Sequence, residues 1–145
     1  MPVPADPPAL AEALRAPLLQ VSRRLRQEAQ RVGMSALDAL LLGHVRKRPG
    51  VTASELADIE RMTRPSMSSH IKRLEAAGWI TRSGDRADGR RADLQITAAG
   101  EAQLAAIRQS RNDWLAARLA RLDPDARAAL AAAHEPLLQL LSLEP

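Results

Sequence analysis

The sequence of 145 residues contains no cysteine, phenylalanine or tyrosine, and tryptophan occurs only twice. Without cysteine the chain can form no disulfide, thiolate nucleophile, iron–sulfur cluster or cysteine-ligated zinc site. Hydrophobic residues still make up 46% of the chain, and most of them are alanine and leucine. These two residues favour helices, whereas strands favour β-branched and aromatic residues, so the composition predicts a mainly α-helical fold.

Long apolar runs are absent as well. No stretch approaches the ~18 apolar residues that indicate a transmembrane helix. The first residues, Met1–Asp6, lack the basic region and the apolar run of a secretion signal. A length of 145 residues matches one ordinary domain. We therefore expect a single domain over residues 1–145, in a cytoplasmic protein that does not associate with a membrane.

Motifs for catalysis and metal binding are also missing. The three histidines, His44, His70 and His134, lie far apart, and none has a second ligand at the spacing of a helical metal site. The sequence contains no phosphate-binding loop, serine-hydrolase motif or dinucleotide-binding fingerprint. We predict no enzymatic activity, no catalytic residue, no metal and no cofactor.

Positive charge is concentrated in the middle of the chain. Residues 44–92 hold 11 basic and 6 acidic side chains, whereas the rest of the chain holds 10 basic and 11 acidic ones. Nucleic-acid-binding proteins concentrate charge in this way, because neutralised phosphates supply most of their non-specific affinity. A solvated basic surface would give the same distribution, so charge alone leaves both interpretations open.

The chain before residue 50 is predicted to form two helices. Leucines and a valine between residues 10 and 25 form one helical stripe. Pro17 should kink or divide this helix, and Gly33 should end the segment. Ser35 should then cap a second helix, which Pro49 and the following glycine stop.

Two short helices are predicted next. Thr52-Ala-Ser-Glu is a capping box ahead of a helix over residues 53–59. Thr63 should cap the following helix, which runs to residue 77 and stops at Gly78. Two short helices separated by a few residues are typical of a helix-turn-helix.

The second of these helices has an apolar face and a polar face. On a helical wheel Ile71 and Leu74 fall within about 40° of Met67, so these three side chains should be buried. His70 should flank the polar face, whose centre is formed by Pro65, Ser69, Lys72 and Ala76. Small hydroxyl side chains together with Lys and Arg suit a helix in the major groove of DNA. An ordinary amphipathic helix would show the same pattern, but the capped helix before it and the basic segment after it favour DNA.

The next segment is predicted to be a β-hairpin with strands over 79–82 and 93–97. Its loop is rich in turn formers, and four arginines lie on or beside it, namely Arg82, Arg86, Arg90 and Arg91. An arginine on a projecting loop can enter the minor groove, and Asp88 is placed to orient Arg90 through an ion pair. After the hairpin, Thr97 should cap a long helix through Leu122, and Asp123 should cap a last helix that Pro136 bends.

The stretches Thr52–Ala57, Arg64–Glu75 and Ala77–Arg82 resemble the winged helix-turn-helix of MarR-type transcriptional regulators. Asp88-Gly-Arg-Arg, continuing to Leu94-Gln-Ile-Thr and Gly100, is similar to the wing signature of that family. The turn between the short helices departs from the common helix-turn-helix pattern, because Glu-Arg-Met replaces the frequent glycine.

This resemblance implies a mainly α fold with a small β-hairpin wing. A winged helix-turn-helix region over 35–97 would bind DNA, and a helical region over 7–32 and 98–143 would dimerise. The resemblance further implies a homodimer that represses transcription at a palindromic operator in double-stranded DNA. The DNA-binding residues would be Arg64, Ser66, Ser68, Ser69, Lys72, Arg73, Arg86, Arg90 and Arg91, with Asp88 orienting the wing.

Relatives that sense phenolic compounds bind them between the dimer helices and the winged domain, so the resemblance also implies a small-molecule effector. The distinctive candidates for its pocket are Met34, His44 and Trp114, although each could equally be a packing residue. Two other functions remain open. One is a winged-helix module that binds an acidic protein partner, and the other is small-molecule binding without DNA.

Overall fold

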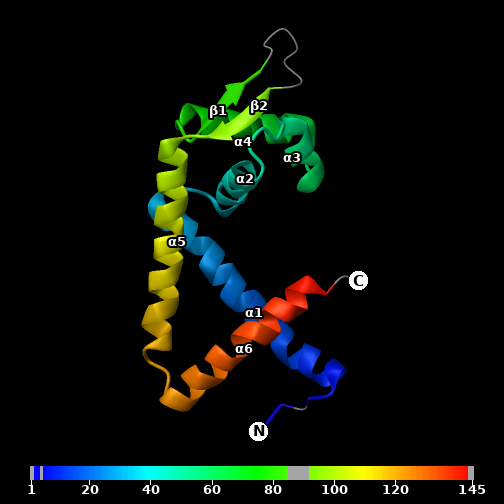
Figure 1. Cartoon of the computed structure of the whole chain (residues 1–145), viewed down its shortest axis with the longest axis vertical. Coiled ribbons are helices and arrows are strands. Elements are labelled where there is room, and N and C mark those ends of the chain that lie inside the picture. The colour runs from blue at the N-terminus through cyan, green and yellow to red at the C-terminus, as the bar shows by residue number, and fades with distance from the viewer. Residues whose placement is uncertain (1, 4, 85–91, 144–145) are drawn as a thin grey trace. The chain divides into compact units, whose positions relative to one another are not determined.

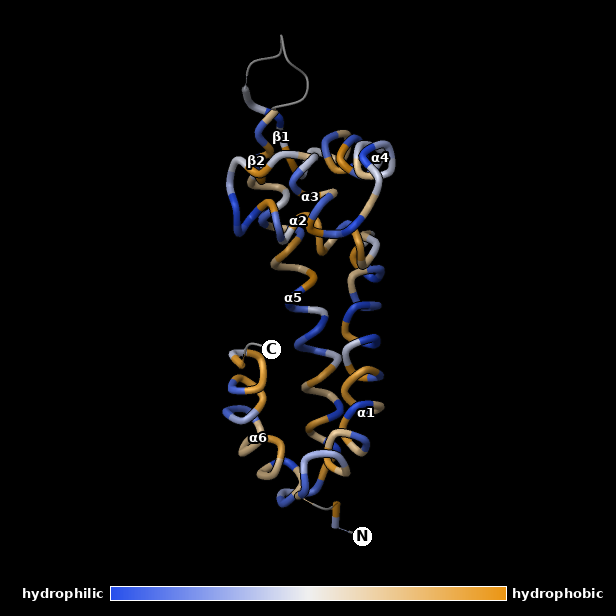
Figure 2. The backbone as a smooth tube through the Cα atoms, turned by 90° about the vertical axis from the view of Figure 1, so that its right-hand side faces the viewer, coloured by the Kyte–Doolittle hydropathy of each residue, from blue (hydrophilic) through white to orange (hydrophobic). Residues whose placement is uncertain are grey.

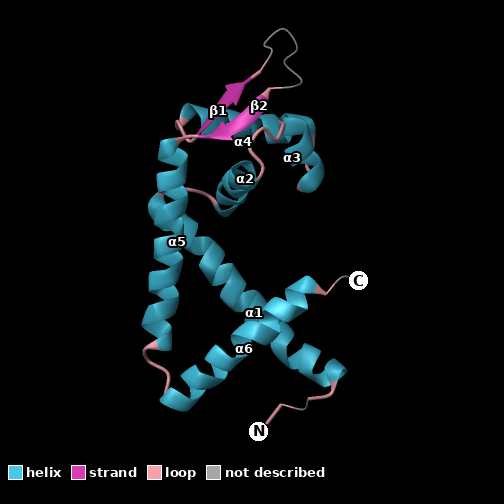
Figure 3. Cartoon of the chain, in the orientation of Figure 1, coloured by secondary structure: helices cyan, strands magenta, loops and turns pink. Residues whose placement is uncertain are grey.

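The structure is a computed structural model that describes residues 2–3, 5–84 and 92–143. The chain forms two compact units, residues 1–111 and 112–145, and the division falls within its fifth α-helix. The described residues are mainly helical with one two-stranded antiparallel sheet, which confirms the predicted fold class (Figure 3). In chain order the elements are α1 (Pro7–Gln27), the 3-10 helix η1 (Glu28–Val32), α2 (Ala36–Lys47), α3 (Ala53–Ile59), α4 (Arg64–Ala76), β1 (Ile80–Ser83), β2 (Asp93–Ile96), α5 (Ala98–Leu119) and α6 (Pro124–Ser142) (Figure 1).

The predicted capping residues begin their helices as expected. In each case the side-chain oxygen accepts a hydrogen bond from the backbone N–H three residues later, which satisfies one of the donors left open at a helix start. These bonds are 3.1 Å for Ser35, 3.2 Å for Thr52, 3.3 Å for Thr63 and 2.8 Å for Asp123. The helix boundaries in the middle of the chain therefore follow from local sequence.

The sequence predicts that Pro17 kinks or divides the first helix, and the second of these outcomes does not occur. This helix is not divided at Pro17 and runs without interruption from Pro7 to Gln27. A proline removes one helical hydrogen bond, and on a helix as exposed as α1 water can satisfy the carbonyl that loses its donor. The change of geometry comes later, where η1 begins, and Gly33 ends that segment with φ +82° as predicted. Helix α5 ends at Leu119, three residues before the predicted end.

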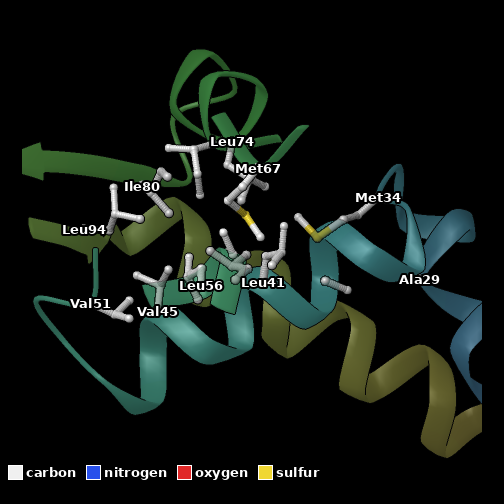
Figure 4. Close-up of a cluster of buried hydrophobic side chains, with 14 of the residues drawn as sticks. Ala29, Met34, Leu41, Val45, Val51, Leu56, Met67, Leu74, Ile80 and Leu94 are labelled. Carbon is white, nitrogen blue, oxygen red and sulfur yellow. The ribbon is translucent and has the colours of Figure 1, made fainter. Parts of the chain in front are cut away.

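The hydrophobic core lies among η1, α2, α3, α4, the hairpin and the start of α5. Among the described residues it contains fifteen buried apolar side chains, of which Figure 4 shows a close-up. Leu41, Leu56 and Met67 come from three successive helices and are each 0% exposed. Ile80 and Leu94 add one residue from each strand. This core holds α3 and α4 against α2, and so it sets the position of the helix-turn-helix.

The sheet has a further partner that the sequence did not indicate. In the antiparallel pair of β1 and β2, Ile80 lies opposite Ile96 and Ser83 lies opposite Asp93. Strand β1 therefore starts one residue later than the sequence predicts. On its other edge β2 bonds the segment before α3, because Gly50 N–H donates to Leu94 O and Leu94 N–H donates to Val51 O, both at 2.9 Å. The hairpin is therefore tied to the segment that leads into the helix-turn-helix by backbone hydrogen bonds on one edge of β2.

Candidate nucleic-acid interface

Helix α4 has one buried face. Met67, Ile71 and Leu74 are each 0% exposed, as the helical wheel predicts. The helix starts at Arg64, where Thr63 provides the cap, and Pro65 occupies the first turn, where a missing N–H costs nothing. The three buried residues therefore determine which side of α4 faces solvent.

The solvent side of α4 carries most of the residues predicted to bind DNA. Ser68 is partly buried, whereas Arg64, Ser66, Ser69, Lys72 and Arg73 are exposed. The Ser69 hydroxyl donates to the Pro65 carbonyl at 3.3 Å within the helix. Here we call Arg64, Ser66, Ser69 and Lys72 the α4 outer face. It combines two cations with two short hydroxyl side chains, which allow a polyanion to approach closely.

Two other side chains of α4 contact a carboxylate of α2. Asp38 is 7% exposed, and Nη2 of Arg73 donates to its Oδ1 and Oδ2 at 3.1 and 3.2 Å. Nδ1 of His70 lies 2.9 Å from the same Oδ1. His70 lies on the flank of α4 with its side chain 17% exposed and directed to Asp38, and its place beside the DNA face stays a prediction. Asp38 is thus a residue of the site that sequence reasoning missed. The one available signal, an acid three residues after the Ser35 cap, is equally typical of an ordinary helix start.

The turn between α3 and α4 explains how the chain manages without the usual glycine. Arg61 adopts φ +52°, the left-handed conformation that glycine prefers. Arg61 N–H donates to Asp58 O at 3.3 Å, and Met62 N–H donates to Ala57 O at 2.9 Å. These bonds close α3 in the manner of a glycine-ended helix. The left-handed conformation of an L residue costs about 1–2 kcal/mol, against which the two hydrogen bonds contribute about 1 kcal/mol each.

The end of α4 is joined to the start of α5 through Thr97. The Thr97 hydroxyl donates to the Gly78 carbonyl at 2.6 Å and accepts from Gly100 N–H at 3.0 Å. Gly78 ends α4 with φ +79°. Gly100 allows α5 to start directly against the strand, because a Cβ atom there would lie 2.7 Å from Ile96 Cγ1. The Thr-x-x-Gly pattern of the sequence therefore has a structural role.

The predicted wing falls largely outside the described residues. Arg86, Asp88, Arg90 and Arg91 all belong to the segment 85–91, so their assignments stay predictions. At the base of the hairpin, Arg82 Nε donates to Glu75 Oε2 at 2.8 Å. This ion pair directs the Arg82 guanidinium toward the end of α4.

The three residues predicted to line an effector pocket have separate environments. Met34 is 3% exposed and belongs to the hydrophobic core. His44 Nε2 lies 2.8 Å from Glu60 Oε1, which links α2 to the turn before α4. Trp114 belongs to the second unit, where the Arg118 guanidinium lies 3.9 Å from its ring centroid. Within the described ranges, no helix is long and apolar enough to cross a membrane, and no group of acidic and histidine side chains could hold a metal ion.

Comparison with known proteins gives a consistent result. Residues 32–91 match the model of the MarR family. The chain is 32% identical over 138 residues to an uncharacterized HTH-type transcriptional regulator from Mycobacterium bovis, covering 94% of this chain and 95% of that protein. The crystal structure of a putative transcriptional regulator from Pseudomonas aeruginosa has a TM-score of 0.76 and 34% identity, covering 93% of this chain and 95% of that chain. A Staphylococcus aureus MepR variant bound to an oligodeoxyribonucleotide has the same fold, with a TM-score of 0.68, 18% identity and coverage of 92% and 98%.

Proposed function

Because the chain belongs to the MarR family of transcriptional regulators, we propose that it is a homodimeric repressor that binds a palindromic operator. The observation that carries this proposal is the division of α4. One face is anchored in the core by Met67, Ile71 and Leu74, and the α4 outer face is free to contact DNA. A helix held in this way can enter the major groove without any rearrangement of the domain.

The chemistry of the α4 outer face supports a division of roles on DNA. Arg64, at the start of the helix, can donate two hydrogen bonds to a guanine edge. Ser66 and Ser69 are short, so they permit the helix to approach base edges. Lys72, a flexible point charge, suits a phosphate. The MepR variant supports this use of the fold, because its structure contains an oligodeoxyribonucleotide.

The wing is proposed to add a second contact. Arg90 would enter the minor groove with Asp88 orienting its guanidinium, and Arg86 and Arg91 would contact neighbouring phosphates. Arg82 is already paired with Glu75. The three loop arginines outnumber the two loop aspartates, Asp85 and Asp88, and DNA phosphates can neutralise the excess charge.

Homodimerisation is supported by the apolar side chains exposed on α1 and α6. No residue of either helix is buried in the single chain. Figure 2 shows hydrophobic positions recurring along both helices. Burying one leucine stabilises by about 1.5–3 kcal/mol, so a second copy that covers these side chains would form a stable pair. The exposed leucines are Leu14, Leu18 and Leu19 in α1 and Leu130, Leu137, Leu138, Leu140 and Leu141 in α6.

Release by a small-molecule effector is the part of the proposal that only the family resemblance supports. In the described residues, Met34 is part of the core and His44 pairs with Glu60, so both already have structural partners. The test is to add small apolar or anionic compounds to the protein–operator complex and to measure the DNA that is released.

Selection from a random duplex library tests the function directly. Purified protein should enrich an inverted repeat whose half-sites lie about 10 base pairs apart, one helical turn. Sedimentation should show one dimer per duplex, and log Kd should change steeply and linearly with log salt. If no duplex is retarded at low salt, the repressor is rejected, and a module that binds an acidic protein partner becomes the better explanation.

A further inference from the structure

We infer that Asp38, which lies on α2 and outside the α4 outer face, is a positioning residue for DNA reading. It fixes the rotation of α4 and the orientation of Arg73. This inference rests on the proposed DNA-binding function and concerns how specificity arises in it. Asp38 is suited to the role because its carboxylate is nearly buried and both of its partners, His70 and Arg73, belong to α4.

The first argument concerns the rotation of α4 about its own axis. The apolar contacts of Met67, Ile71 and Leu74 press the helix onto the core, but hydrophobic attraction is not directional. Hydrogen bonds are directional and weaken steeply when they are misaligned. His70 and Arg73 are three residues apart and so lie on the same side of the helix. Two such side chains held by one carboxylate restrict the rotation that decides which residues meet a base edge.

The second argument concerns the hydrogen atoms of the cluster. Arg73 Nη2 lies 2.6 Å from His70 Nδ1, and both nitrogens lie within 3.2 Å of the Asp38 oxygens. A histidine Nδ1 either carries a proton and donates or lacks one and accepts. An ionised carboxylate only accepts, so Arg73 donates to Asp38, and in the tautomer that carries a proton on Nδ1, His70 donates to Asp38 as well and accepts nothing from Arg73. Asp38 is therefore the common acceptor of the cluster, and the two α4 side chains depend on it.

The third argument concerns Arg73. Both of its contacts with Asp38 use Nη2, and its side chain is still 56% exposed. A guanidinium fixed at one end and open to solvent at the other can contact a DNA phosphate in one defined orientation. Because less side-chain freedom is lost on binding, a complex that matches this orientation is favoured over complexes that do not.

The test uses two variants that change the charge equally. Asp38→Asn and Asp58→Asn each remove one negative charge, and Asp58 lies exposed on the neighbouring α3. General electrostatics predicts that both variants bind random duplex as tightly as the unmodified protein or more tightly. The positioning role predicts that Asp38→Asn alone loses affinity for the selected operator. Its ratio of operator to random-duplex affinity should fall about tenfold, since one oriented charge-assisted contact corresponds to such a factor.

Three further measurements separate positioning from a general loss of structure. Asp38→Glu keeps the charge and suits the third position of a serine-capped helix, and its ratio should also fall. In a background that replaces both α4 partners, His70→Gln with Arg73→Gln, Asp38→Asn should cause little additional loss of the ratio. Without DNA, NMR of the Arg73 guanidinium should show restricted rotation in the unmodified protein and in Asp58→Asn, and free rotation in Asp38→Asn.

An unchanged ratio in Asp38→Asn overturns the inference, and so does a full tenfold effect that persists when both His70 and Arg73 are replaced. If the unmodified protein binds no duplex, the proposed function fails instead. The guanidinium NMR then still decides whether Asp38 holds Arg73.

Discussion

Gly100 provides the sharpest prediction for the stability of the fold. In a helix, replacing glycine by alanine normally stabilises by about 1 kcal/mol, because alanine loses less backbone entropy on folding. At Gly100 the added Cβ atom would lie 2.7 Å from Ile96 Cγ1 and closer still to the Trp79 carbonyl oxygen. A backbone oxygen cannot move aside as a side-chain tip can, so the start of α5 must shift.

The magnitude follows from the contacts that this shift disturbs. Forcing an extra methyl group into a packed site costs about 1–3 kcal/mol. The displacement also strains the hydrogen bond from Thr97 N–H to Trp79 O, which is 3.0 Å long and contributes about 1 kcal/mol. After subtraction of the helix gain, Gly100→Ala should lower the free energy of unfolding by about 1–3 kcal/mol.

Gly43→Ala is the matched control, because Gly43 lies inside α2 and an added Cβ atom would meet nothing within 4 Å. It should stabilise the protein by up to about 1 kcal/mol. The two variants should therefore differ by about 3 kcal/mol, or roughly 6–12 °C in thermal midpoint at 2–4 °C per kcal/mol. Thermal unfolding followed by circular dichroism at one protein concentration measures this difference. A Gly100→Ala variant as stable as Gly43→Ala would refute the close approach of α5 to Trp79.

Three further predictions concern DNA binding and capping. Lys72→Ala should weaken binding to all duplexes and reduce the slope of log Kd against log salt by about 1. Arg23→Ala, which removes an exposed cation of α1, should leave the slope unchanged. If gel-shift titrations give the same slope for Lys72→Ala and the unmodified protein, Lys72 is not part of the interface. Arg90→Ala should weaken operator binding by about 1–3 kcal/mol, mainly at sites with A·T-rich flanks, and unchanged affinity would contradict the wing assignment. Thr52→Ala removes the hydroxyl that accepts from Glu55 N–H and donates to Glu55 Oε1, both at 3.2 Å. Urea unfolding should show that the free energy of unfolding falls by about 0.5–2 kcal/mol. An unchanged free energy of unfolding would mean that the cap is redundant.

The elements of the helix-turn-helix could be predicted because their signals are local. The hydroxyls of Thr52 and Thr63 lie three residues from the amides they bond, so the sequence contains both partners within one turn. The burial of Met67, Ile71 and Leu74 follows from helical periodicity alone. The outer side of α4 was predictable for the same reason, since a helix with one buried face must expose the other.

The rest depends on contacts between distant residues. Asp38 and Arg73 are 35 residues apart, and no spacing rule connects an acid in one helix with an arginine two helices later. Pairing of β2 with the segment before α3 joins Gly50 to Leu94, and neither residue carries a strand signal for that pairing. Periodicity could show that Arg73 and His70 are on the flank of α4, but only tertiary packing decides that both turn toward α2.

The Thr97 hydroxyl ties two helices to a single oxygen atom. The Gly78 carbonyl just after α4 and the Gly100 amide in the first turn of α5 both bond it, so the two bonds couple the end of one helix to the start of the other. Each bond contributes only about 1 kcal/mol net, and the Thr97 N–H adds a third bond at the same joint, to the Trp79 carbonyl at 3.0 Å. In the proposed homodimer, the angle at which each copy presents α4 to DNA would therefore depend in part on a threonine outside the α4 outer face.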